Sequence, residues 1–279
     1  MIRDKSKIVE QLGQIVDLLI LNGTLTNCPG LIHGKTGIAV FFFHYARYTS
    51  NKFFEDQAMI LIESIQQQIL QQHTVDYADG LAGIGAAIEY LEQNNFVEVD
   101  TNEALEDIDR AIFNAVIFGD HTDAGFFTGL SGLAYYLLFR VTGRFADDNY
   151  ISTLDNKMLL IHITDTFERI FPLLKKTECE DVIRFLHALN QTCIYPSKAR
   201  RLIQSFSSSL PPSKQEDSYR KSVEANCESK FHLLLSTFQD RTQAVGDLGL
   251  YGGLAGAGLF LLSQLDNTHD TWKKLLWIS

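Results

Sequence analysis

A short glycine pattern occurs four times along this chain of 279 residues and constrains the fold more than any other feature. Each copy has two glycines three residues apart, Gly-x-x-Gly, followed by an apolar and often aromatic run. The copies begin at Gly34, Gly80, Gly129 and Gly253. The first three are 46 and 49 residues apart, a period typical of repeat architectures. The longer gap of 124 residues before the last copy indicates one or two repeats that have lost their glycines.

We expect each repeat to consist of an amphipathic outer helix, a loop, and an inner helix that begins at the motif glycine. The runs after the motifs, such as Ile38–Phe43 and Leu133–Phe139, are apolar on all sides, which indicates burial. Glycine inside a helix costs roughly 0.5–1 kcal/mol relative to alanine, so we expect backbones to approach closely where inner helices start. No hairpin signal for a sheet is present. The predicted class is all-α, an α/α toroid of about five hairpins, formed by a single domain over residues 1–279.

Apolar stripes at helical spacing predict the outer helices. The stripes are Ile8, Leu12, Ile15, Val16 and Leu19; Ala58, Leu61, Ile62, Ile65 and Ile69; and Leu105, Ile108, Ile112 and Val116. A capping-box pattern at residues 100–103 precedes the third stripe. Further helices are predicted over 151–171 and 180–192, with an extra one near 198–206. The serine-rich and proline-containing stretch Ser205–Ser218 is predicted to be a loop.

Composition excludes several kinds of partner. Lys+Arg 24 against Asp+Glu 34 gives a net charge of −10, whereas nucleic-acid binding needs a basic face. The longest apolar run, Ile38–Phe43, is too short to span a membrane, and the first twenty residues do not resemble a secretion signal. The cysteines are too few and scattered for a disulfide framework; they are Cys28, Cys179, Cys193 and Cys227. We expect a cytoplasmic protein that binds neither nucleic acid nor membrane.

Polar side chains gather in the segments before the inner helices, which should lie together at one end of the fold. Convergent polar groups above an apolar core fit a ligand site. We take His33 as an acid/base candidate and expect a functional role for Asp76. The binding candidates are Tyr77, Asp79, Asp123, Thr128, Asp247 and Tyr251. Because helix N-termini carry unpaired amides and partial positive charge, we expect this end to suit a carboxylate or a peptide carbonyl. Its acidic side chains would pair with a cationic peptide.

Structural interpretations of these residues stay open. Asp79 and Thr128 each precede a motif glycine, where a side-chain oxygen can satisfy the first amides of a helix. His33 is either an acid/base group or a structural histidine. His121 lies between Asp120 and Asp123. It either forms a pair with an aspartate that shifts its pKa, or it is part of a solvated loop.

At its four glycine segments the sequence resembles the lanthionine synthetase C-like family, over nearly the whole chain from Asn27 to Leu276. The resemblance implies an α/α toroid whose inner helices open with Gly-x-x-Gly. In the relatives that cyclise peptides, it implies a zinc enzyme that adds cysteine thiols to dehydroamino acids. Asp76, four residues before Gly80, matches an aspartate of the cyclases, and His33 matches a histidine that directly precedes a motif glycine. A peptide substrate or a partner protein is therefore implied.

The family's zinc ligands do not match this chain. Where the cyclases have Cys-His-Gly, this sequence has Ile32-His33-Gly34, and it also lacks the family's Trp-Cys dipeptide. Catalytic zinc sites need three protein ligands. We therefore expect neither zinc nor another cofactor.

Three functions fit these features. The first is a peptide-modifying enzyme of the lyase or cyclase type that works with His33 and Asp76. The second is a degenerate, non-catalytic member that binds a peptide or partner protein. The third is an α/α-toroid glycosidase, which needs two carboxylates on either side of the cleft. The candidate pair is Asp76 with Asp123.

Overall fold

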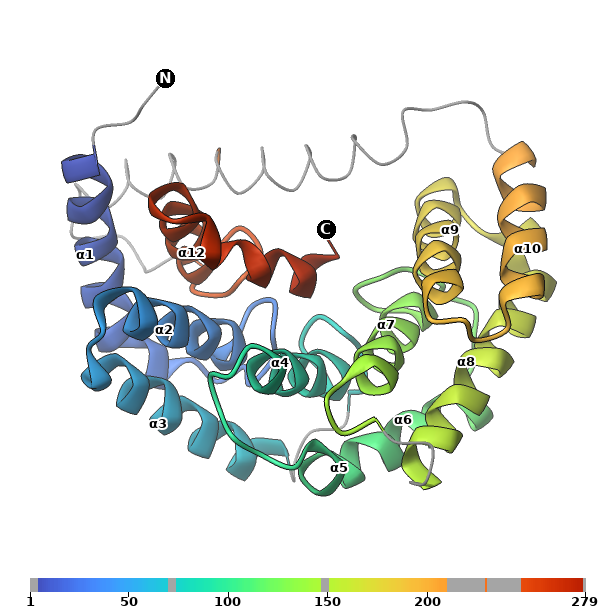
Figure 1. Ribbon diagram of the computed structural model, residues 1–279, viewed down its shortest axis with the longest axis horizontal. Coiled ribbons are helices and arrows are strands. Elements are labelled where there is room, and N and C mark those ends of the chain that lie inside the picture. Colours follow the sequence, from blue (N-terminus) through green and yellow to red (C-terminus); the bar gives the residue numbers. More distant parts are fainter. Residues whose placement is uncertain (1–4, 70–73, 147–150, 210–228, 230–246, 278–279) are drawn as a thin grey trace. The chain divides into compact units, whose positions relative to one another are not determined.

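The computed structural model describes residues 5–69, 74–146, 151–209, 229 and 247–277, and all regular elements in these ranges are helices (Figure 1). The α-helices are α1 (Lys5–Asn22), α2 (Lys35–Thr49), α3 (Lys52–Ile69), α4 (Leu81–Gln93), α5 (Thr101–Ala104), α6 (Glu106–Phe118), α7 (Leu130–Thr142), α8 (Ile151–Ile170), α9 (Lys176–Gln191), α10 (Pro196–Ser209) and α12 (Leu254–Leu265). Three 3-10 helices follow other elements: η1 (Gly23–Leu25), η2 (Phe171–Leu173) and η3 (Asn267–Leu276). The predicted all-α class is confirmed for this part of the chain.

The predicted stripes form the buried faces of the outer helices. All five residues of the first stripe are buried in α1, and Ile108, Ile112 and Val116 are buried in α6. In α3 only Ala58, Leu61 and Ile65 are buried. The Asp100 carboxylate accepts the Asn102 N–H at 2.9 Å and caps α5, which is a short helix separate from α6.

The inner helices begin where the glycines predict. Gly34, Gly80, Gly129 and Gly253 are the N-cap residues of α2, α4, α7 and α12. These four helices are buried on nearly all sides; α7, for example, buries every residue from Leu130 to Arg140. The all-round apolarity of their sequences is the cause of this burial.

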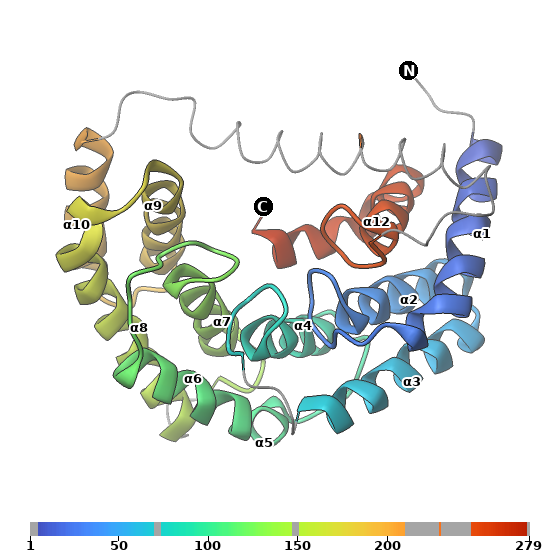
Figure 2. The ribbon, with the colours of Figure 1, turned by 180° about the vertical axis from the view of Figure 1, so that it is seen from behind.

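The described chain forms two compact units (Figures 1 and 2). Unit 1 comprises Met1–Gln72 and Glu216–Ser279, and unit 2 comprises His73–Gln215. In unit 1, α2 packs on α3 and α12, and α1 packs on α12. In unit 2, the inner helices α4, α7 and α9 pack in succession, with α6 and α8 outside them.

The glycine-poor gap contains the helix α9, which packs on α7, and the helix α10, which packs on α9. The extra helix predicted near 198–206 is thus confirmed. The loop predicted over Ser205–Ser218 is wrong at its start, because α10 continues to Ser209. Residues 210–218 lie outside the described residues.

Among the described residues, one helical stretch, Lys5–Leu25, is long and apolar enough to cross a bilayer by length and composition alone. A core helix with a buried apolar stripe meets the same criterion. Here the α1 part of the stretch packs on α12 through the buried stripe that includes Ile15 and Leu19.

The six residues before each N-cap glycine form equivalent loops, which we call loop 1 (28–33), loop 2 (74–79), loop 3 (123–128) and loop 4 (247–252). In each case the first amide of the inner helix donates to the carbonyl seven residues earlier. These bonds are Lys35 N to Cys28 O (2.9 Å), Leu81 N to Thr74 O (3.1 Å), Leu130 N to Asp123 O (2.9 Å) and Leu254 N to Asp247 O (3.0 Å). The loop therefore bends back over the start of its helix.

This bend explains the first glycine of each motif. A Cβ on Gly253 would lie 2.6 Å from both the N and the O atom of Gly249, closer than real Cβ atoms come. The backbone at Gly253 is extended, with φ −103° and ψ −175°, a conformation open to any residue. Close approach of the loop, rather than backbone strain, therefore requires glycine.

Neighbouring loops are joined in the same way in both units. In loop 2, the amides of Tyr77 and Ala78 donate to the Phe127 carbonyl of loop 3, at 3.1 and 2.9 Å. In loop 4, the amides of Leu250 and Tyr251 donate to the Ile32 carbonyl of loop 1, at 2.7 and 3.3 Å. The last motif thus joins the first within unit 1, as the second joins the third within unit 2.

Glycines further along the inner helices serve helix packing. A Cβ on Gly85 would lie 2.5 Å from the Tyr136 ring of α7, and a Cβ on Gly258 would overlap the Phe41 ring of α2. Close packing between inner helices, predicted as the reason for the motif glycines, therefore applies to these later positions. The first glycines are explained by their own loops instead.

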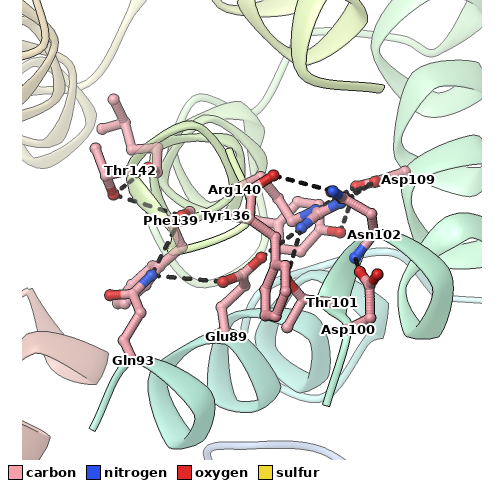
Figure 3. Close-up of polar contacts among 12 residues, drawn as sticks. Glu89, Gln93, Asp100, Thr101, Asn102, Asp109, Tyr136, Phe139, Arg140 and Thr142 are labelled. Atoms are coloured by element: carbon pink, nitrogen blue, oxygen red, sulfur yellow. Dashed lines mark hydrogen bonds and ion pairs between the residues drawn. The ribbon is translucent and has the colours of Figure 1, made fainter. Parts of the chain in front are cut away.

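A buried ion-pair network joins α4, α6 and α7 in unit 2 (Figure 3). Arg140 of α7 pairs through Nη1 with Glu89 of α4 and through Nη2 with Asp109 of α6, the latter at 2.8 Å. The Tyr136 hydroxyl donates to Asp109 Oδ1 at 2.5 Å. Burial raises the pKa of Glu89, and the Arg140 guanidinium opposes that rise. The Glu89 side chain is fully buried, so its charge depends on this partner.

Substituting a motif glycine should destabilise the protein, because the new Cβ meets loop backbone that has nowhere to move. We expect Gly253→Ala and Gly80→Ala each to cost about 1–3 kcal/mol of unfolding free energy in urea denaturation. Gly13→Ala is the matched control. Gly13 lies inside α1, a Cβ there meets nothing within 4 Å, and alanine should stabilise by about 0.5–1 kcal/mol. Equal effects at all three positions would contradict the loop explanation.

Removing Arg140 should leave Glu89 as an uncompensated buried charge. We expect Arg140→Met to lower the unfolding free energy at pH 7.5 by about 3–5 kcal/mol. The loss should shrink as pH falls, because protonation of Glu89 removes the unpaired charge. Adding Glu89→Gln to Arg140→Met should restore part of the stability at pH 7.5. Arg110→Met, whose exposed ion pairs lie on the surface of α6, should cost less than about 1 kcal/mol.

Candidate functional site

In unit 1, the ends of two loops bring together the predicted residues His33 and Asp247. His33 directly precedes the N-cap of α2 and its side chain is 49% exposed. Its Nε2 lies 3.9 Å from Asp247 Oδ2, an ion-pair distance when the imidazole is protonated. The other oxygen, Asp247 Oδ1, accepts the Gly249 N–H at 2.9 Å, which fixes the carboxylate.

The contact between loops 1 and 4 determines this pairing. A Cβ on Gly249 would lie 2.5 Å from the His33 Cα, so glycine at this position lets loop 4 lie against loop 1. Tyr251 is half-buried in the same loop, and its amide bonds to Ile32. The predicted candidates of unit 1 thus belong to one pair of joined loops.

In unit 2, Asp76 shapes loop 2. Its Oδ1 accepts the Asp79 N–H at 2.9 Å, and both aspartates are half-buried. Asp76 occupies the place that glycine occupies in the other three loops, at Gly30, Gly125 and Gly249. Loop 2 therefore carries a side chain where the others have none.

Tyr77 belongs to the core of unit 2. Its side chain is fully buried, with ring centroids 4.6 Å from Phe126 and 5.8 Å from Tyr135. The predicted binding role does not fit this position, because the ring is enclosed by protein. The sequence does not record whether an aromatic residue near a motif glycine faces the core or the solvent.

Asp123 and Thr128 hydrogen-bond to each other across loop 3. The Thr128 hydroxyl donates to Asp123 Oδ2 at 2.6 Å, and Asp123 Oδ1 accepts the Gly125 N–H at 2.8 Å. Both residues are exposed. The alternative that Thr128 caps α7 is not what the structure shows, since the N-cap Gly129 has no side-chain cap bond and the hydroxyl bonds to Asp123. The ring of His121 bonds to the Val116 carbonyl at 2.8 Å.

The starts of the inner helices are not open anion sites. In α12 the first three amides, from Leu254 to Gly256, donate at 3.0–3.2 Å to loop 4 carbonyls. The first amide of each of the other inner helices, α2, α4 and α7, also donates to a carbonyl of its own loop. The prediction that these termini offer unpaired amides to a carboxylate is therefore wrong, because backbone carbonyls already satisfy them. Near these helix starts, side chains are therefore the groups that can bind a ligand.

Asp181 of α9 is a residue of this region that the sequence did not single out. Its Oδ2 accepts the Phe126 N–H of loop 3 at 3.0 Å, and Arg184 lies 3.5 Å from its Oδ1. Burial raises its pKa to about 6, against the opposing effects of Arg184 and the Phe126 bond. A single aspartate on a helix without the glycine motif gives no sequence signal for such a contact.

The zinc that the resemblance implies has no matching ligand set in the described ranges. No group of three His, Cys, Asp or Glu side chains there is placed to hold a metal ion. Ile32, at the cysteine place of Cys-His-Gly, is buried at 1% exposure. Cys28 is half-buried in loop 1, Cys179 is buried in α9 and Cys193 is exposed. Cys227 lies outside the described residues.

A comparison with models of protein families identifies the family of this chain. No curated protein matches the sequence. A solved structure of nisin cyclase aligns over 98% of this chain and 97% of its own, with 14% identity and a TM-score of 0.49. The model of the family described as lanthionine synthetase C-like protein matches residues 27–184, more than half of the chain. The matched residues include the first three glycine motifs and Asp181. The chain therefore belongs to the lanthionine synthetase C-like family.

Proposed function

We propose that this protein modifies a peptide held over loops 1 and 4, with His33 as the acid/base group and Asp247 as its partner. The observation that carries the proposal is the 3.9 Å approach of His33 Nε2 to Asp247 Oδ2 between the first and last loops. Family membership supports a peptide as the substrate. Asp76, the second predicted acid/base residue, is occupied in shaping loop 2 and we assign it to binding.

The geometry suits transfer of a proton at His33. The imidazole is half-exposed, so a substrate group can reach it, and an imidazolium formed there faces the Asp247 carboxylate. The Gly249 N–H holds one oxygen of that carboxylate, so an imidazolium at His33 forms near a fixed negative charge. A histidine beside an orienting carboxylate is the usual arrangement of a general base.

The thioether-forming reaction of the family needs a group that takes the thiol proton, and His33 can do this. The thiol of a peptide cysteine gives its proton to His33, and its sulfur bonds to the Cβ of a dehydroalanine. The carbon–carbon double bond opens and the Cα takes up a proton, so the product is a thioether of unchanged mass. A histidine base raises the small thiolate fraction that a free cysteine has near neutral pH.

Charge favours a neutral or cationic peptide. Asp79, Asp123 and Asp247 lie in the loops, and the whole chain has a net charge of −10. Each of these carboxylates attracts Lys and Arg side chains, and salt screens this attraction. We also propose a cytoplasmic location, because the four scattered cysteines do not suggest a disulfide framework.

The glycosidase alternative is not favoured. Its two carboxylates, Asp76 and Asp123, each accept a backbone N–H of their own loop, and Asp123 also accepts the Thr128 hydroxyl. These bonds give both groups a structural role, and family membership points to peptides.

The test is a synthetic lysine-containing peptide with one cysteine and one dehydroalanine, incubated with and without added Zn²⁺. Cyclisation is followed by mass spectrometry as loss of an alkylatable thiol without loss of mass. We expect the protein to accelerate cyclisation. His33→Ala should slow it by about 10²-fold or more, the usual contribution of a general base. Asp247→Asn, which keeps an acceptor for Gly249, should cause a smaller loss.

His187→Ala is the matched control, because His187 is an exposed histidine on α9. It should leave the rate unchanged. All variants should keep their helix content, since both site residues are partly exposed. Peptide binding without acceleration would identify a non-catalytic binding member, and full activity of His33→Ala would contradict the proposed base.

A further inference from the structure

Loop 3 faces the position of the repeat that has no glycine motif. In loops 2 and 4, the amides of Tyr77 and Leu250 donate to a carbonyl of the next loop, Phe127 O or Ile32 O. Phe126 occupies the equivalent place in loop 3, three residues before the N-cap glycine. The next inner helix, α9, has Lys175 at its N-cap, and the Lys175 amide donates to the Glu178 carboxylate at 2.7 Å. The repeat that follows loop 3 therefore begins without a glycine-motif loop.

Asp181 supplies an acceptor for the Phe126 amide from the side of α9. Its Oδ2 accepts the Phe126 N–H at 3.0 Å, close to the 2.7–3.3 Å of the bonds from Tyr77, Leu250 and their neighbours. We propose that Asp181 replaces the missing loop carbonyl and is the positioning residue that holds loop 3, with Asp123 and Thr128, against α9. Asp181 itself does not touch the reacting atoms.

The carboxylate is enclosed, so its charge state matters. The charged neighbours acting on it are Arg184, which favours ionisation, and Glu178 and Glu180, which oppose it; all three lie on α9. Loop 3 contributes the Phe126 amide, while its Asp123 is bonded within the loop and the nearby His121 ring bonds to Val116. The first turn of α7 carries no titratable side chain. On α10, Lys198 is engaged with Asp165 and Glu168 of α8.

Burial raises the pKa of Asp181 to about 6, above its ordinary value of 3.8. An ionised acceptor binds an amide more strongly than a neutral one, so loop 3 is held more firmly above pH 6 than below it. The linkage with stability has the opposite sign. Between pH 4 and 6 the folded state binds the proton more tightly than the unfolded state, so this group lowers stability as pH rises through that window.

The experiment measures protection of the Phe126 amide against hydrogen exchange by NMR, corrected for intrinsic exchange rates. In the wild type, protection should rise about fivefold to tenfold between pH 5 and 7.5, with a midpoint near 6. Asp181→Asn keeps an oxygen acceptor and should show protection without this step. Asp181→Ala should lose most of the protection at both pH values. Asp165→Asn, an exposed carboxylate of an ion pair on α8, should behave as the wild type.

Unfolding in urea gives a second readout. Asp181→Asn should become more stable than the wild type as pH rises from 4 to 7, because it removes a charge that the fold disfavours. A variant with unchanged Phe126 protection, or a pH step that persists in Asp181→Asn, would overturn the proposal. If Asp181→Ala does not fold, the comparison of Phe126 protection between Asp181→Asn and the wild type still tests the proposal.

Discussion

The hydrogen bond from the first amide of each inner helix to the carbonyl seven residues earlier determines much of this structure. It bends the preceding loop over the helix start and requires glycine at Gly34, Gly80, Gly129 and Gly253. It also gives the first amide of the helix a hydrogen-bond acceptor. The groups near each helix start that can bind a ligand are therefore side chains. His33 stands one residue before its glycine, whereas Asp123 and Asp247 stand six before theirs. The place of each residue within its own loop follows from one repeated backbone bond.

The backbone pattern also shows how a repeat is lost without loosening its neighbours. Where a loop has a successor, as in loops 2 and 4, a carbonyl of that successor receives its amide. Where the successor is missing, the Asp181 side chain receives the amide of Phe126. A carboxylate can titrate and a carbonyl cannot, so degeneration of one repeat adds a proton-dependent group to an otherwise fixed set of contacts.

The fold was largely predictable and the site only in part. Periodicity revealed the stripe of α1, and the glycines marked the first residues of the inner helices, because both are local properties of the chain. Pairings between distant segments were not local. His44 and His269 bury their Nδ1 atoms 3.1 Å apart, although 225 residues separate them. The candidate His33 found its partner Asp247 through the contact of the last loop with the first, which no spacing in the sequence records.

That same contact has a consequence for the order in which the protein can form. Unit 2 is a continuous stretch, and its neighbouring helices contact each other over short sequence distances, which favours early and rapid folding during synthesis. Unit 1 needs Ile32 to meet Leu250, so α2 and its loop must wait until almost the entire chain has been made. His33 and Asp247 are therefore brought together only in this final closure, and a nascent chain acquires the site last.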